Sequence, residues 1–349
     1  MTSIKKPEIK QTFNVNIQPY VIKDNMAAEY YEDAKSNFWD VNEVDMSQDK
    51  NDIKKLKKTN PEVWTMLKMI LTFFAGGDNV VIESLSEYFI KHPRSKMDRI
   101  YREFQIMIEN IHMIMYGLAF STYMSPHEQK EQLKLLKDTG VIVDMYKWAL
   151  KWIDPSKKNI KKKHAKNLIV AILNEGIMFQ GPFEIIYYII AMFPSMIPGL
   201  EQFNELIARD ETSHAKYSCF LYKDLKDYEK LSTEEVHAMF REAIDLHMAF
   251  MKTCLTDKKG NDMFDGLTFN MMKGHIEHMA NVYLELIGEK KLYMGIKKTP
   301  LIFAHKRSLE VQTMFFEKKV TQYKRPDQDI NGGFLDDKEL NSFELTDDY

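Results

Sequence analysis

Two Glu-x-x-His motifs contain side chains that could bind metal ions. In the first motif Glu109 and His112 lie within the apolar stretch 102–118, and Tyr116 follows four residues later. On an α-helix, residues three, four and seven positions apart share one face. A carboxylate buried on such a face is costly unless it is paired or bound to a metal. The stretch therefore needs partners from elsewhere in the chain.

The second motif, Glu211 and His214, lies in a later stretch that is also expected to be helical. Each motif is preceded by one acid in an apolar segment, Asp78 before the first and Glu175 before the second. Two carboxylate helices and two Glu-x-x-His helices are the arrangement of dinuclear carboxylate sites in ferritin-like bundles. Carboxylate oxygens with imidazole nitrogens suit iron or manganese. The pattern predicts six metal ligands: Asp78, Glu109, His112, Glu175, Glu211 and His214.

A third Glu-x-x-His pair, Glu234 and His237, shows that the motif alone is a weak signal. Glu234 lies in an expected first helical turn, where acids interact favourably with the helix dipole. No acid in an apolar segment precedes this copy at similar spacing, so we interpret it as structural. His275 and His278 could also be ligands, but without carboxylates at metal spacing we interpret them as packing or surface residues.

Long helices are expected to position the ligands. Glycine and proline are few, and no stretch shows sustained β alternation. Gly76 and Gly77 lie within one predicted helix and indicate a distortion or a close backbone approach. The predicted fold is all-α, a ferritin-like helical bundle with flanking helices and the dinuclear site inside it. Helices are expected over about residues 26–40, 61–91, 95–123, 128–152, 164–193, 200–223, 232–255 and 267–287, with a charged connector after residue 40.

Composition excludes several classes of protein. The chain has 349 residues, a net charge of −3 and no sustained basic stripe, which argues against a nucleic-acid partner. The N-terminus lacks a signal peptide, and no apolar run reaches the roughly 20 residues that span a bilayer, so no membrane association is expected. The two cysteines lack metal-type spacing and indicate a reducing, cytoplasmic compartment.

The sequence divides into a polar N-terminal arm (1–25), a helical domain (26–317) and a polar tail (318–349). Both ends are expected to be flexible. The last 23 residues hold eight acids against one lysine and cannot bury enough apolar area to fold alone. Apolar side chains are nevertheless spaced along this tail, as in a docking peptide.

Several segments of the chain match one known family. They are FWDVNEVDMSQD, FFAGGDNVVIESL, FQIMIENIHMIMYGL, WALKWID, NEGIMFQGPF, PGLEQFNELIARDETSH and the terminal NSFELTDDY. In these segments the chain resembles the radical-generating small subunit of class I ribonucleotide reductase, of the eukaryotic and viral-like type. The resemblance implies that Asp78, Glu109 and His112 hold one metal ion, with glutamates bridging to the other. The second ion would be held by the other three predicted ligands.

The resemblance also implies what the metal site does. Two Fe ions, or Mn or a mixed Mn/Fe pair, would activate O2 and oxidise Tyr116 to a stable tyrosyl radical. Trp39, Asp210 and His112 would carry the radical equivalent towards the surface, and Tyr323 would relay it to the large subunit. The acidic tail would dock there, and the chain would form a homodimer. The apolar pocket that shields the radical would consist of Phe179, Phe183 and Ile207.

Two features of the residues agree with these expectations. Asp210 precedes Glu211 and could accept a hydrogen bond from the outer nitrogen of the metal-bound His112. Cys219 and Cys254 are too few to supply both a redox-active cysteine pair and a thiyl site. The reduction of ribonucleoside diphosphates to deoxyribonucleotides would therefore take place on a separate large subunit.

The chain departs from the family pattern near the predicted radical. Met113 and Ile114 replace small or polar residues, Gly117 stands where serine is common, and Gly77 replaces a small polar residue before Asp78. None of the four is a predicted ligand. The departures bear on hydrogen bonding around Tyr116 and on the dimer contact.

Two alternative functions fit the same metal motif. A stand-alone dimetal oxidase or desaturase would need a substrate channel and gives the acidic tail no role. A ferritin-like iron-binding protein would make Tyr116 and Trp39 incidental. Deletion of residues 330–349 discriminates between these interpretations, because only a small subunit would lose activity with a large subunit.

Overall fold

The computed structural model describes residues 23–138, 140–153, 162–296 and 298–301. Within them the only β interaction is an isolated bridge between Thr256 and Asp262, so the all-α prediction is confirmed. The α-helices of these residues are α1 (Asn25–Ser36), α2 (Asp49–Thr59), α3 (Pro61–Ser84), α4 (Lys96–Tyr123), α5 (Pro126–Asp138), α6 (Gly140–Leu150), α7 (Lys163–Leu173), α8 (Gln180–Met192), α9 (Pro198–Lys223), α10 (Thr233–Leu255) and α11 (Phe269–Leu286).

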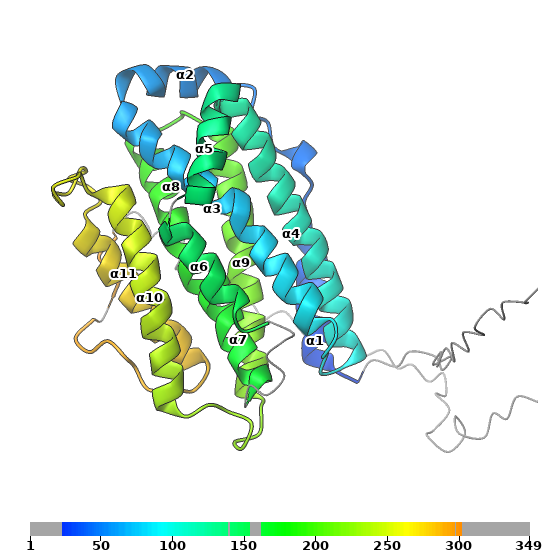
Figure 1. Cartoon of the computed structure of the whole chain (residues 1–349). Coiled ribbons are helices and arrows are strands. Elements are labelled where there is room, and N and C mark those ends of the chain that lie inside the picture. The colour runs from blue at the N-terminus through cyan, green and yellow to red at the C-terminus, as the bar shows by residue number, and fades with distance from the viewer. Residues whose placement is uncertain (1–22, 139, 154–161, 297, 302–349) are drawn as a thin grey trace, which may run out of the picture. The chain divides into compact units, whose positions relative to one another are not determined.

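Four helical segments form the centre of the bundle (Figure 1). Helix α3 packs along α4, and α7 packs along α9, while α4 also contacts α9. Between α7 and α8 the chain forms a π-helical turn, η3 (Asn174–Met178), which contacts α9 and α11. Helices α10 and α11 flank this centre. The centre therefore brings together the four segments that carry the predicted ligands.

We expected the charged segment after residue 40 to be a connector without a helix. The structure instead shows that this segment contains α2. The many lysines of this segment made its helical pattern hard to recognise in the sequence. Its two apolar residues Ile53 and Leu56 are each only 1% exposed. Asp49 in its first turn accepts hydrogen bonds from the backbone N–H groups of Gly199 (2.9 Å) and Leu200 (2.8 Å). These hydrogen bonds give partners to two backbone N–H groups in the first turn of α9, which have none within the helix. Sequence periodicity does not reveal such long-range hydrogen bonds.

Glycines mark close approaches between helices. α3 continues through Gly76 and Gly77, and a Cβ on Gly76 would lie 2.7 Å from the hydroxyl of Tyr146. The close backbone approach is therefore confirmed. The distortion lies further along the chain, at the π-helical segment η2 (Leu85–Phe89).

Two helical stretches, Pro61–Phe89 and Lys163–Met192, are long and apolar enough to cross a membrane by length and composition alone. Of their most apolar windows, 61% and 94% respectively are buried inside the protein. These stretches also carry Asp78 and Glu175, so packing in the bundle accounts for their hydropathy.

Helix α8 buries a carboxylate outside the predicted metal site, which predicts a pH-dependent stability. Burial raises the pKa of Glu184 from 4.5 to about 8, although Gln180 donates a hydrogen bond to it (2.9 Å). Between these pH values the folded protein keeps a proton that the unfolded chain loses. The contribution of Glu184 to the free energy of unfolding is therefore greatest below pH 4.5 and falls as the pH rises to about 8.

Glu184→Gln should raise the free energy of unfolding by up to about 4 kcal/mol near pH 8.5 and change it little near pH 5. Denaturant titrations at the two pH values measure the difference. Glu83→Gln, on an exposed position of α3, is the matched control. Destabilisation by Glu184→Gln at both pH values would instead mean that Glu184 is ionised and paired with His275, whose Nε2 lies 3.7 Å away.

Candidate metal centre

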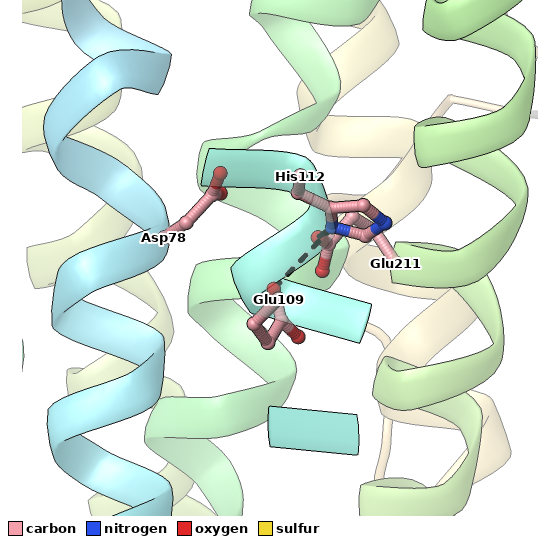
Figure 2. Close-up of side chains that lie close together, drawn as sticks. All are labelled: Asp78, Glu109, His112 and Glu211. Carbon is pink, nitrogen blue, oxygen red and sulfur yellow. Dashed lines mark hydrogen bonds and ion pairs between the residues drawn. The ribbon is translucent and has the colours of Figure 1, made fainter. Parts of the chain in front are cut away.

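The six predicted ligands come from four helical segments and meet inside the bundle. Asp78 lies on α3, Glu109 and His112 on α4, and Glu175 on the π-helical turn η3. Glu211 and His214 lie on α9. All six side chains belong to residues that are at most 3% exposed. Figure 2 shows four of them, Asp78, Glu109, His112 and Glu211, pointing towards one another.

The side chains form two overlapping groups, each with potential ligand atoms within 4.8 Å of one another. Both groups contain Glu109 and Glu211. Asp78 and His112 complete the first group, and Glu175 and His214 complete the second. Two ions held in this way would share two carboxylates. The structure thus identifies which glutamates could bridge, whereas the binding of metal by these residues stays a prediction.

The imidazole of each Glu-x-x-His motif lies close to the glutamate of the other motif. Nδ1 of His112 lies 3.0 Å from Oε1 of Glu211, and Nδ1 of His214 lies 3.0 Å from Oε1 of Glu109. Burial opposes charge on both rings, but the carboxylates outweigh it and raise the pKa of His112 strongly and that of His214 to about 10. In the metal-free protein, imidazolium protons therefore balance part of the negative charge, and metal ions would have to displace them.

Several buried oxygens lack partners, which suits a site for cations. Neither oxygen of Asp78 has a hydrogen-bond partner among the described residues, and the same holds for Oε2 of Glu109, Glu175 and Glu211. Burial raises the pKa of Asp78 and Glu175 well above the usual carboxyl range. A pair of divalent ions would satisfy these oxygens and remove the cost of burying them. The residues present therefore fit a dinuclear metal centre.

A hydrogen-bonded chain leads from the predicted ligand His112 to Trp39. Nε2 of His112 lies 3.3 Å from Oδ2 of Asp210, and Nε1 of Trp39 donates to the same oxygen at 2.7 Å. The Trp39 and His112 rings are stacked with centroids 5.9 Å apart. Arg209 donates to the other oxygen of Asp210 (3.0 Å), which fixes the carboxylate. The structure thus joins the three residues of the predicted radical path.

Tyr116 lies in a buried aromatic pocket. The residue is 0% exposed, its hydroxyl has no hydrogen-bond partner among the described residues, and burial raises its pKa well above 10. Its ring stacks on Phe74 (4.6 Å between centroids, 6° between planes) and meets Phe203 edge-on at 5.8 Å. These two direct ring contacts were not predicted. Phe74 lies four residues before Asp78 on α3, and that spacing could have identified it.

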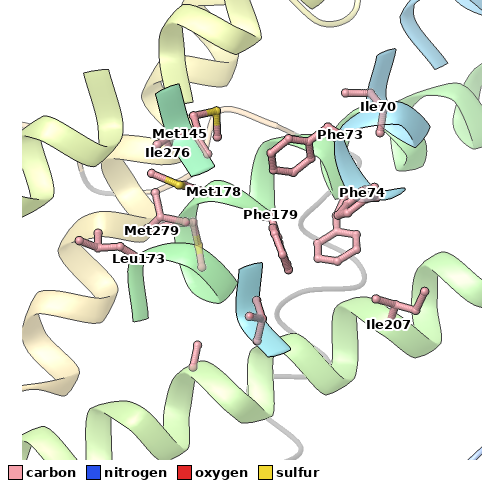
Figure 3. Packing of buried hydrophobic residues seen from close by; sticks show 14 of the residues in the cluster. Ile70, Phe73, Phe74, Met145, Leu173, Met178, Phe179, Ile207, Ile276 and Met279 are labelled. Atoms are coloured by element: carbon pink, nitrogen blue, oxygen red, sulfur yellow. The ribbon is translucent and has the colours of Figure 1, made fainter. Parts of the chain in front are cut away.

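The three predicted pocket residues are all buried, and two of them contact Phe74. Phe74 contacts Phe183 and Phe179, with centroids 4.9 and 5.7 Å away respectively. Ile207 is 0% exposed and lies on α9, below Phe74 in the view of Figure 3. Phe179 and Phe183 thus pack against the ring that stacks on Tyr116.

The remaining candidates lie outside the two ligand groups. His237 of the third Glu-x-x-His pair contacts the backbone oxygen of Lys290 (2.9 Å) at the surface. His275 is buried, and its Nδ1 lies 2.7 Å from the hydroxyl oxygen of Thr299. Tyr323 and the acidic tail lie outside the described residues.

Single substitutions should change the metal content in a way that reflects the shared carboxylates. Wild-type protein should bind about two ions per chain, and Asp78→Ala about one, because Asp78 belongs to one group only. Glu109→Ala should lose both ions. Elemental analysis after loading and dialysis measures this, with Glu234→Ala as the control from the structural copy. An ion retained by Glu109→Ala would contradict a shared role for Glu109.

Comparisons with known proteins agree with this geometry. A family model described as "Ribonucleotide reductase, small chain" matches residues 16–300. The chain is 34% identical over 296 residues to the vaccinia virus (strain Ankara) "Ribonucleoside-diphosphate reductase small chain", covering 84% of this chain and 87% of the relative. It is 32% identical over 324 residues to a ribonucleoside-diphosphate reductase small chain of Arabidopsis thaliana, covering 92% of each.

Among solved structures, the fold is similar to the ribonucleotide reductase R2 subunit from Clostridium botulinum, with a TM-score of 0.71 and 19% identity. That match covers 82% of this chain and 89% of the other. The predicted ferritin-like helical fold is therefore confirmed. From the family model and the two relatives we conclude that the chain belongs to the ribonucleotide reductase small-chain family.

Proposed function

We propose that the protein is the radical-generating small subunit of a ribonucleoside-diphosphate reductase and that Tyr116 carries the radical. One observation supports this assignment above the others. The phenol of Tyr116 is buried in an aromatic pocket on the same helix as Glu109 and His112, from which a hydrogen-bonded chain leads to Trp39. Neither a stand-alone oxidase nor an iron-binding protein would need that combination.

The metal pair would be held by the two groups that share Glu109 and Glu211. When bound, two iron ions, or manganese or one of each, supply the redox chemistry with O2 that oxidises a nearby phenol. The protein contributes ligation, orientation and a dry surrounding. Carboxylate and imidazole ligands suit both metals, so our choice of iron rests on the family resemblance.

Tyr116 would lose an electron and a proton together. Its raised pKa keeps the phenol protonated at neutral pH, so no phenolate is available as the starting form. The carboxylate of Asp78 also raises this pKa, after the larger effect of burial. Phe74 covers one face of the ring and keeps water and reductants away from the radical.

Asp210 would hold both ends of the transfer path. Its Oδ2 is the common acceptor for the indole N–H of Trp39 and the outer nitrogen of His112. Trp39 is 2% exposed and lies in the link between α1 and the short helix η1 (Val41–Glu43). From there Tyr323 would relay the radical equivalent to a large subunit on which the acidic tail docks. The buried free thiols of Cys219 and Cys254 are consistent with a cytoplasmic protein.

Tyr116→Phe should abolish a tyrosyl signal in low-temperature EPR after addition of Fe(II) and O2. The variant should still bind about two metal ions, because Phe removes only the hydroxyl. Tyr123→Phe, a second buried tyrosine of α4 whose hydroxyl donates to Asp49, is the matched control and should keep the signal. A tyrosyl signal that persists in Tyr116→Phe would place the radical elsewhere.

We also propose that the exposed face of α4 is where a second copy of the chain binds. Met107, Ile114 and Leu118 share one helical face, are 39–49% exposed, and lie opposite the ligand face. Exposed apolar residues in such a row mark protein interfaces. A Cβ on the neighbouring Gly117 would meet nothing within 4 Å, so this part of the face is open.

Ile114→Asp should convert the dimer to monomers, because it buries a charge at the interface. Sedimentation velocity at micromolar concentration measures the assembly state. Met294→Asp, at an exposed methionine outside α4 that is 84% exposed, is the control and should stay dimeric. A dimer that is unchanged by Ile114→Asp would exclude this face.

A further inference from the structure

Helix α4 buries a guanidinium group two turns before the ligand Glu109. Arg102 is 0% exposed, and its planar group lies 4.7 Å from the ring centroids of both Phe89 and Tyr217. Its Nε lies 3.8 Å from Oδ1 of Asp98, one turn earlier. A buried charge is costly unless its partners are fixed. These contacts hold the guanidinium in one place.

The guanidinium determines how Gln105 is oriented. Nη1 of Arg102 donates to Oε1 of Gln105 at 2.7 Å. Arginine has only donors, so the amide oxygen of Gln105 must face it and the amide NH2 must point the other way. That NH2 donates to Oε1 of Glu175 at 2.9 Å and lies 3.3 Å from Oε1 of Glu109. Without Arg102, the amide oxygen would lose its donor, and only the two carboxylates would hold the amide in place.

The amide in turn selects one oxygen of Glu175. Oε1 is occupied by the hydrogen bond from Gln105, whereas Oε2 has no hydrogen-bond partner among the described residues. Glu175 lies on the π-helical turn η3, so its own helix does not hold it in regular register. An external donor is therefore needed to fix the carboxylate.

We propose that Arg102 is a positioning residue that acts through Gln105, so that Glu175 offers only Oε2 to the metal ion it binds. The inference rests on the proposed metal centre and adds to it residues that touch no metal. Groups that orient ligands in this way typically change metal affinity by about 10–100-fold. The effect should fall on the ion of the Glu175 and His214 group.

Mn(II) titrations of metal-free, full-length protein test the proposal, with free Mn(II) counted by EPR. Arg102→Met and Gln105→Met should each weaken the binding of one of two ions by about 10–100-fold and leave the other within about threefold. In the double variant, Arg102→Met should add no further loss to that of Gln105→Met, because both act along one route. Arg99→Met, which removes an exposed arginine of α4 that pairs with Glu103, should have no effect.

Three results would overturn the proposal. Unchanged Mn(II) affinities with a lowered melting temperature would give Arg102 a role in packing only. Additive losses in the double variant would mean that Arg102 acts without Gln105. If Arg102→Met does not fold, the test rests on Gln105→Met alone. Unchanged Mn(II) affinities in that variant would then overturn the proposal. Wild-type protein that binds fewer than two ions would instead overturn the proposed function itself.

Discussion

Four carboxylates and two imidazoles lie buried in the core, and the rest of the structure depends on how their charge is balanced. Each buried, unpaired carboxylate costs several kcal/mol. The two Glu-x-x-His motifs reach across to each other, so that Glu109 and Glu211 belong to both ligand groups. Helices that pack side by side along their length hold this cluster together. The segments that carry the six predicted ligands are therefore the ones that form the centre of the bundle.

Helix α4 divides its functions among its faces. The inner face presents Glu109, His112 and Tyr116 to the core, and the outer face exposes Ile114. At its N-terminal end the buried Arg102 orients the amide that meets the ligands from α4 and η3. One helix thus places two predicted metal ligands, the phenol of Tyr116 and an exposed apolar row at fixed separations. Because α4 uses several of its faces, one apolar stretch contains many of the predicted functional residues.

Much of the metal centre could be predicted from the sequence, because the spacing of the residues shows which of them share one face of a helix. The two Glu-x-x-His motifs and their preceding acids identified the six side chains that the structure brings together. The spacing of Phe74 from Asp78 could have identified the ring that stacks on Tyr116. Spacing could not show which glutamates are shared, because that depends on how the helices pack. Helix α2 was missed for the same reason, since long-range bonds from Asp49 and two buried side chains hold it in place.

The central claim is that two metal ions share Glu109 and Glu211, and anomalous scattering from crystals loaded with Mn(II) tests it most directly. Difference maps should show two peaks per chain, one beside Asp78 and His112 and the other beside Glu175 and His214, with both shared carboxylates touching both peaks. A single peak, or two peaks that share neither Glu109 nor Glu211, would contradict the account.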